Sequence, residues 1–244
     1  MHKLPLAEIE SIVGKDNLLT APEERMCYSF DATNRKYLPD AVAFPRNADD
    51  VSAIMRCANL HRFPVIPRGA GSGFAGGSLA VVGGLVLALT RMNRIVSIAP
   101  ENLTAVVEPG VVTGDFQKAV GQWGLFYPPD PASLQFSTMG GNAATCAGGP
   151  RCVKYGVTKN YILGLEVVLP TGELLKTGVQ TLKGVAGYDL TSLFVGCEGT
   201  LGTITLITVR LIPLPPARRC MLATFPRLDD APLAVSAIIR ERII

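Results

Sequence analysis

The sequence has 244 residues, enough for one large domain or two small domains with a buried core. Hydrophobic residues make up 48% of it and charged residues only 18%, which excludes a disordered chain. The net charge of +3 comes from charges spread along the chain, so we expect no nucleic-acid partner.

The cysteines and the N-terminus indicate a reducing compartment. No two of the six cysteines form a C-x-x-C pair, so the spacing predicts neither a zinc site nor an iron–sulfur cluster, and no metal site is expected. The first residues are amphipathic and charged, unlike a signal peptide. We therefore expect a cytoplasmic protein with reduced thiols.

One uncharged stretch, residues 69–90, is long enough to span a membrane. It contains seven glycines, including two Gly-Gly pairs, which would unwind a helix exposed to lipid. We interpret it as part of a soluble core and expect at most a peripheral association with membranes.

The first part of the chain predicts a helix and then a β-α-β unit. Apolar residues at Leu4, Ile9, Ile12 and Val13 favour a helix within residues 3–20, followed by a loop. Asn47 is the expected N-cap of the next helix, whose first turn holds two aspartates. The elements expected after the loop are a strand at 41–45, a helix at 48–62, and strands at 64–67 and 84–89.

The second part predicts more strands than helices. Thr113 is expected to cap a helix, and Pro170 to Gly172 form the turn of a hairpin. The expected elements are strands at 95–98 and 104–110, a helix at 113–123, hairpin strands at 161–170 and 173–177, a helix at 190–195, strands at 203–213 and 220–225, and a helix at 229–242.

The first of three glycine-rich segments, residues 67–78, follows a strand. Glycines allow a positive φ, which we expect at Gly71, so successive N–H groups can surround an anion such as a pyrophosphate. The spacing also fits G-x-G-x-x-G, but that motif requires a following helix and a later acidic residue, whereas a strand follows here and position 96 is Val. The alternative is a flexible loop without a ligand.

The other two segments are less specific. Residues 137–149 are nearly all small, so a helix N-terminus with free N–H groups is expected to face a flat or anionic ligand there, with Asn142 and Thr145 offering hydrogen bonds. Tight helix–sheet packing would explain the same composition. In residues 196–202, Glu198 by itself is better explained as a surface charge or a structural ion pair.

Taken together and in order, these segments resemble a known family. PRGAGSGFAGGS, LALTRMNRI, VEPGV, PPDPASLQFSTMGGNAATCAGG and CEGTLGTITLITVRL are similar to the FAD-binding domain (PCMH-type) of the vanillyl-alcohol-oxidase-like flavoproteins. Within that family the branch of glycolate oxidase FAD subunits and D-lactate dehydrogenases is most similar. The resemblance implies an α+β fold of two subdomains with mixed and antiparallel sheets.

The resemblance also implies a domain organisation and a set of FAD contacts. It implies an N-terminal helical segment at 1–37, an FAD-binding domain at 38–216 with subdomains at 38–93 and 94–216, and the start of a substrate domain at 217–244. The implied FAD contacts are Pro67, Arg68, Gly69, Ala70, Gly71, Ser72, Gly73, Ser78, Pro131, Thr138, Met139, Gly140, Gly141, Asn142, Ala144, Thr145, Gly148, Glu198, Gly199 and Ile204.

The implied reaction is hydride transfer from the carbinol carbon of a small 2-hydroxy acid to FAD, with an iron–sulfur or second flavin subunit as a possible electron acceptor. Noncovalent FAD is expected, because the first glycine loop has no His or Cys. The family's metal-binding and proton-abstracting histidines lie in its second domain, and this sequence has only His2 and His61, so no catalytic residue is assigned. The alternatives are a noncatalytic FAD-binding electron-transfer subunit and a degenerate fragment.

Overall fold

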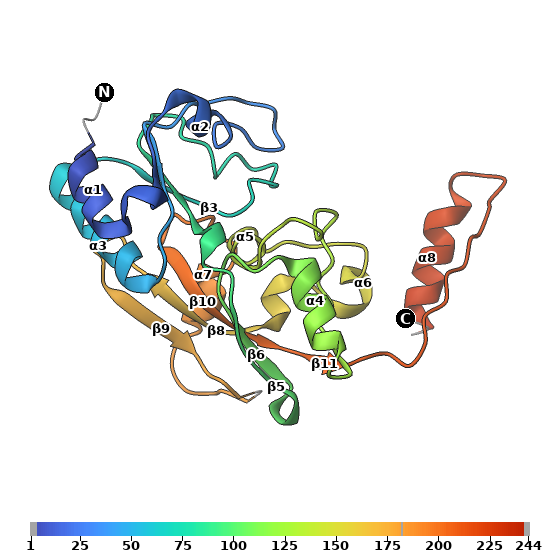
Figure 1. Ribbon diagram of the computed structural model, residues 1–244. Coiled ribbons are helices and arrows are strands. Elements are labelled where there is room, and N and C mark those ends of the chain that lie inside the picture. The colour runs from blue at the N-terminus through green and yellow to red at the C-terminus, as the bar shows by residue number, and fades with distance from the viewer. Residues whose placement is uncertain (1–3, 182, 242–244) are drawn as a thin grey trace. The chain divides into compact units, whose positions relative to one another are not determined.

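A computed structural model describes residues 4–181 and 183–241 (Figure 1). His2, the start of the first predicted helix at residue 3 and the end of the last one at residue 242 lie outside these ranges. The chain divides after Pro213 into a large compact unit and a small one that begins at Leu214. The two units are described separately.

The first sheet of the large unit has the strand order β1-β2-β4-β3. Strands β2, β4 and β3 run parallel, and β1 pairs antiparallel with β2. Parallel strands need a long crossover connection, which a helix provides between β2 and β3. The strands are β1 (Leu18–Leu19), β2 (Ala41–Ala43), β3 (Val65–Arg68) and β4 (Leu85–Ala88).

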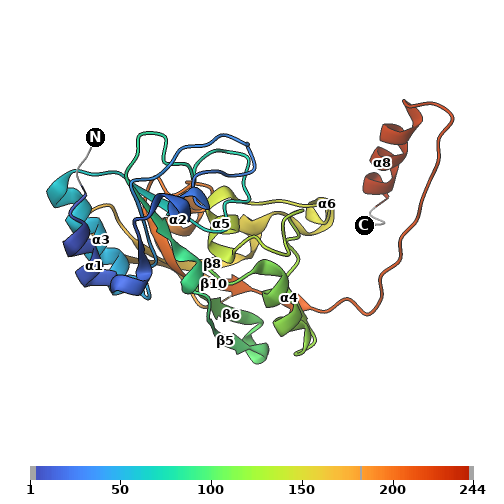
Figure 2. The same ribbon diagram turned by 45° about the horizontal axis from the view of Figure 1, so that its top comes forward.

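Helices α1 (Leu6–Val13) and α3 (Ala48–His61) lie side by side (Figure 1 and Figure 2). Ile9 and Val13 of α1 and Ile54 of α3 are fully buried in one cluster with residues of β2 and β4. The predicted N-cap is confirmed, since the Asn47 side chain accepts a hydrogen bond from the backbone N–H of Asp50.

The second sheet has five antiparallel strands in the order β5-β6-β10-β8-β9. The largest cluster of buried apolar residues lies against it and includes Phe116 of α4 and Ala143 of α5. The elements are β5 (Ile95–Ala99), β6 (Thr104–Val107), α4 (Thr113–Gly121), α5 (Met139–Thr145), β8 (Ile162–Val168), β9 (Leu174–Gly178), α7 (Leu190–Phe194) and β10 (Thr203–Arg210).

Several short elements complete the large unit, and all of them except β11, which is the end of the strand predicted at 203–213, were not expected from the sequence. They are α2 (Pro22–Met26), β7 (Leu125–Phe126), α6 (Cys152–Tyr155) and β11 (Ile212–Pro213), together with short 3-10 turns. Elements of two to five residues carry too few positions for a periodic pattern. The α+β fold with a mixed and an antiparallel sheet agrees with the prediction.

Three local predictions for the large unit were wrong. The first helix ends at Val13 rather than near residue 20, because Gly14 takes a φ of 88° and the chain continues as a 3-10 turn and β1. Thr113 does not cap α4, because its hydroxyl donates to the Ser137 carbonyl. The strand predicted at 203–213 is interrupted at Leu211, between β10 and β11.

In the small unit, the predicted final helix is present as α8 (Asp230–Arg240), but the strand predicted at 220–225 is not formed. Met221 and Leu222 are 83% and 91% exposed, so these apolar residues have no partner surface in the described chain. A strand needs a hydrogen-bonded neighbour, which explains the failure of this prediction. Among the described helices, none combines the length and apolar character needed to cross a membrane.

Candidate functional site

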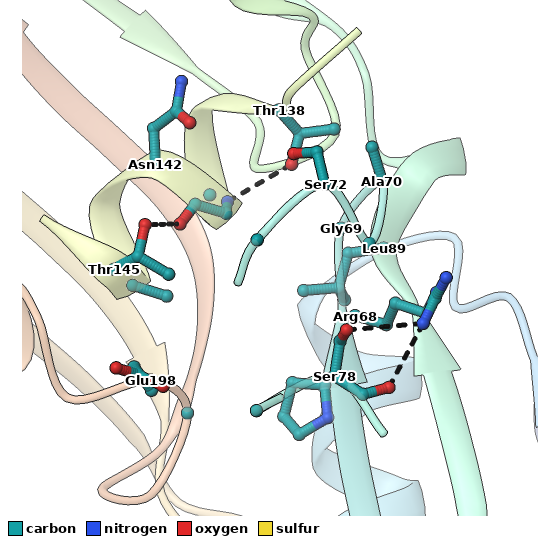
Figure 3. Close-up of a pocket in the computed structure, with 18 of the residues that line it drawn as sticks. Arg68, Gly69, Ala70, Ser72, Ser78, Leu89, Thr138, Asn142, Thr145 and Glu198 are labelled. Atoms are coloured by element: carbon teal, nitrogen blue, oxygen red, sulfur yellow. Dashed lines mark hydrogen bonds between the residues drawn. The ribbon is translucent and has the colours of Figure 1, made fainter. Parts of the chain in front are cut away.

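A cavity lies in the large unit, between the loop that follows β3 and helix α5 (Figure 3). Together with the open solvent at its mouth, the space between its walls is about 1090 Å³. All three glycine-rich segments line it. The sequence therefore brings together in space three motifs that lie far apart along the chain.

The loop that follows β3 supplies unpaired hydrogen-bond donors. From Ala70 to Ser78, no backbone N–H donates to another atom of the described residues. The predicted positive φ of Gly71 is confirmed at 68°, and Gly76 has a φ of 79°. Four residues of the loop, Ala70, Phe74, Ala75 and Gly77, are exposed and the others are half-buried, so these N–H groups are accessible to solvent or to a ligand. This loop is therefore suited to bind an anion through its backbone.

Arg68, at the end of β3, is buried, and its guanidinium is used within the protein. It donates to the Phe30 carbonyl at 2.6 Å, and to the carbonyl and hydroxyl of Ser78 at 3.2 and 3.3 Å. Burial lowers the pKa of Arg68, and the nearby Asp31 carboxylate partly offsets this. Arg68 thus fastens both ends of the glycine loop, rather than projecting freely toward a ligand.

The expected free N–H groups at the start of α5 are not free, so this prediction was wrong. The N–H groups of Met139 and Gly140 donate to the carbonyls of Val111 and Pro109, both at 2.8 Å. The N–H of Gly141 donates to the Thr138 hydroxyl at 3.2 Å, as expected of an N-cap. A bridge between Val112 and Thr138 brings these carbonyls over the helix end, which a sequence pattern does not show.

The polar side chains of α5 also serve the protein itself. Asn142 is buried, and its amide donates to the hydroxyls of Thr113 and Ser137 at 2.6 and 3.3 Å. The Thr145 hydroxyl donates to the Gly141 carbonyl at 3.0 Å. In Figure 3 the side chain of Asn142 points away from the loop that carries Gly69 and Ala70. What α5 offers to the cavity is mainly a flat surface of small residues.

The third segment closes the cavity at the far end of α5. The N–H groups of Gly196 and Glu198 donate to the carbonyls of Ala143 and Ala144 at 3.0 and 2.8 Å. Glu198 takes a φ of 53°, which is costly for a residue with a side chain and is tolerated only where the surroundings enforce it. Its carboxylate lies so close to Gly77 that a Cβ there would be 3.0 Å from Glu198 Oε2.

All the predicted binding residues except Met139 and Gly148 line the cavity. Met139 is 2% exposed and belongs to the core of the second sheet, and a Cβ on Gly148 would face Cys152. Residues that line the cavity but were missed are Asp31, Ala75, Gly76, Gly77, Leu89, Pro109, Ser133, Ala147, Gly202 and Thr203. Three of these, Ala75, Gly76 and Gly77, already lie inside the first glycine-rich segment, between the predicted residues Gly73 and Ser78.

The cavity fits a flat, anionic dinucleotide. The unpaired N–H groups from Ala70 to Ser78 can bind a diphosphate. Thr203 adds a hydroxyl that is buried, lines the cavity and has no hydrogen-bond partner in the described chain. The small residues of α5 leave room for an aromatic ring system. Fold and cavity together define the class as an α+β protein that binds a nucleotide cofactor.

Comparison with known proteins gives the same class more specifically. Residues 39–178 match the family described as FAD binding domain, and the chain belongs to this family. The glycolate oxidase subunit GlcD of Bacillus subtilis is 48% identical over 97% of this chain and 51% of its own length. The D-lactate dehydrogenase of Anaerostipes hadrus is 40% identical over 80% of this chain and 41% of its own length.

Solved structures agree on the fold. An alkyldihydroxyacetonephosphate synthase covers 99% of this chain with a TM-score of 0.84 and 25% identity, and 46% of that chain is matched. The chain spans about half the length of the curated relatives it matches.

Proposed function

We propose that this chain is the FAD-binding part of a flavin-dependent 2-hydroxy-acid dehydrogenase of the glycolate or D-lactate type. The observation that carries the proposal is the meeting of the three glycine-rich segments around one cavity, in a chain that is 48% identical to a glycolate oxidase subunit. Bound FAD would supply the acceptor for the hydride of the substrate's carbinol carbon.

The chain's own residues would bind and orient this cofactor. The N–H groups from Ala70 to Ser78 would bind the diphosphate, and Arg68 would hold their loop in shape. The face of α5 that carries Gly141 and Ala144 would lie along the ring system. The loop with Glu198, Gly199 and the adjoining strand residue Ile204 would close the far end.

The residues that line the cavity include no histidine and no cysteine among those described. We therefore propose that FAD is held without a covalent bond. The purified chain should be yellow, should prefer FAD over FMN because its loop is suited to a diphosphate, and should release the flavin on acid denaturation. A colourless protein that ignores added FAD, or a flavin that stays on the denatured protein, would contradict the proposal.

No proton acceptor for the substrate hydroxyl is assigned to the cavity. Its ionisable residues are Asp31, Arg68 and Glu198, and the described histidine, His61, lies on α3 outside the lining. We propose that the base belongs to a part of the protein beyond these 244 residues. The isolated chain should bind FAD but show negligible turnover of glycolate or D-lactate with a dye acceptor.

Anaerobic mixing of the isolated chain with each hydroxy acid tests this directly. The oxidised flavin band should persist, and it should bleach when the longer protein is used. Rapid bleaching with the isolated chain would place the base within these residues. Because a curated relative is named a subunit, we also propose a partner subunit as electron acceptor. We propose a cytoplasmic location on the separate ground of the cysteine pattern and the charged N-terminus.

A further inference from the structure

A second cluster of reactive side chains lies on the two helices that cover the first sheet. Glu8 comes from α1, and Cys57 and His61 come from α3. Residues four apart face the same side of a helix, so Cys57 and His61 point together toward α1. One ligand atom from each of the three residues lies within 4.8 Å of the other two. None of the three lines the FAD cavity.

The cluster combines a buried donor with two accessible ones. Cys57 is 3% exposed, whereas the side chains of His61 and Glu8 are 36% and 45% exposed. The thiol is thus shielded from solvent, whereas the imidazole and the carboxylate beside it are partly exposed. A metal ion could enter from solvent, and a water molecule could fill a fourth position.

Thiolate, imidazole and carboxylate are the three ligand types that bind Zn²⁺ in proteins. With bonds of about 2.0–2.3 Å, ligand atoms in a tetrahedral zinc site are about 3.3–3.8 Å apart. In the structure, His61 Nε2 and Glu8 Oε2 are 2.9 Å apart, and the thiol is within 4.8 Å. Small rotations of exposed side chains bridge these differences. We propose that Glu8, Cys57 and His61 bind one Zn²⁺, which fastens α1 to α3.

The simpler interpretation is that Glu8 and His61 form only a surface ion pair. Such pairs contribute little to stability, and they do not require a buried thiol beside them. The two interpretations differ in what they predict for Cys57. A zinc site needs its sulfur, because the Cys57 thiol would release its proton to solvent and bind the metal as a thiolate. An ion pair does not.

The test uses the full 244-residue chain in its FAD-bound form, freed of metal by a chelator. It is dialysed against buffered Zn²⁺, and its zinc content is measured by mass spectrometry. The wild type should retain one zinc per chain. Cys57→Ser, His61→Gln and Glu8→Gln should each weaken binding by about 10- to 100-fold or more. Flavin content reports whether each variant is folded, independently of zinc.

Matched controls separate this site from adventitious binding. Glu10→Gln changes an exposed carboxylate of the same helix, and Cys27→Ser removes an exposed thiol, so both should bind zinc like the wild type. X-ray absorption at the zinc edge should show one sulfur in the coordination shell. Zinc should also raise the melting temperature of the wild type but not of His61→Gln.

Equal zinc retention by the wild type and all three ligand variants would overturn the proposal. A coordination shell without sulfur would also overturn it. Glu8 and His61 would then be interpreted as a surface ion pair without a metal-binding role for Cys57. Neither result would bear on FAD binding, because the cluster and the cavity share no residue.

Discussion

The loop after β3 and the start of α5 are both rich in glycine and both line the cavity, yet they contribute in opposite ways. The loop leaves the N–H groups from Ala70 to Ser78 without partners in the described chain. In α5, the N–H groups of Met139, Gly140 and Gly141 are all bonded within the protein. The loop therefore offers hydrogen bonds, whereas α5 offers space.

The difference shows that glycine-rich composition has two separate physical causes. In the loop, glycine permits the positive φ of Gly71 and Gly76, and the backbone there leaves its N–H groups without a partner in the described chain. In α5, glycine is required because the helix approaches another chain segment closely, since a Cβ on Gly140 would lie 2.5 Å from the Cβ of Pro109. Substitutions should separate a loss of binding from a loss of packing.

The largest effect is expected for Gly71→Val. Gly71 has a φ of 68°, and a Cβ there would overlap the guanidinium of Arg68. The strained backbone and the displaced arginine together cost about 3 kcal/mol or more, which is at least about a hundredfold in FAD affinity. Flavin fluorescence titration measures this. Unchanged affinity would show that the loop does not bind FAD.

Gly73→Ala is the matched control for folding. A Cβ on Gly73 meets no protein atom within 4 Å, and Gly73 is not among the residues with positive φ. Its apo form should therefore unfold at the same urea concentration as the wild type. A strongly destabilised Gly73→Ala protein would mean that the loop tolerates no side chain at any position. Weak FAD binding by Gly71→Val would then report loss of folding rather than loss of a binding site.

A smaller effect is expected for Arg68→Ala, and it tests whether Arg68 acts on the loop or on the ligand. Removing the guanidinium leaves the Phe30 carbonyl without this donor and releases Ser78. We expect a loss of about 1.5–3 kcal/mol in the stability of the apo-protein, together with weaker FAD binding. Urea unfolding without flavin checks the first part. Weaker FAD binding with unchanged apo stability would instead make Arg68 a direct ligand.

The smallest effects come from a pair of alanine substitutions in α5. Gly140→Ala must push against Pro109 and should cost about 1–3 kcal/mol of apo stability. Gly141→Ala meets only the Thr138 hydroxyl, at 3.1 Å, and lines the cavity. Its apo stability should stay within about 1 kcal/mol of the wild type, because alanine favours a helix, while its FAD affinity should fall. Equal apo stability and equal FAD affinity of the two variants would contradict the proposal that the Gly141 side of α5 lies along the ring system of FAD.

The sequence predicted most of the local structure, because local signals suffice for it. The helical spacing of apolar residues and the N-cap at Asn47 predicted α3. The run of β-branched residues predicted β10. Prediction from the sequence failed where an element forms only if a second segment pairs with it. The apolar residues 220–225 have strand composition, but no neighbouring strand is present for them to pair with in the described chain.

The sequence by itself determined which three glycine-rich segments line the cavity, because their composition marks them and their order resembles that of a known family. The tertiary structure alone decided which donors remain for a ligand. Three groups that the sequence offers as donors are already bonded within the protein. Arg68 donates to the Phe30 carbonyl, Asn142 donates to the Thr113 hydroxyl, and the N–H of Gly140 in α5 donates to the Pro109 carbonyl. It also placed Glu8 beside Cys57 and His61, because only packing brings α1 against α3.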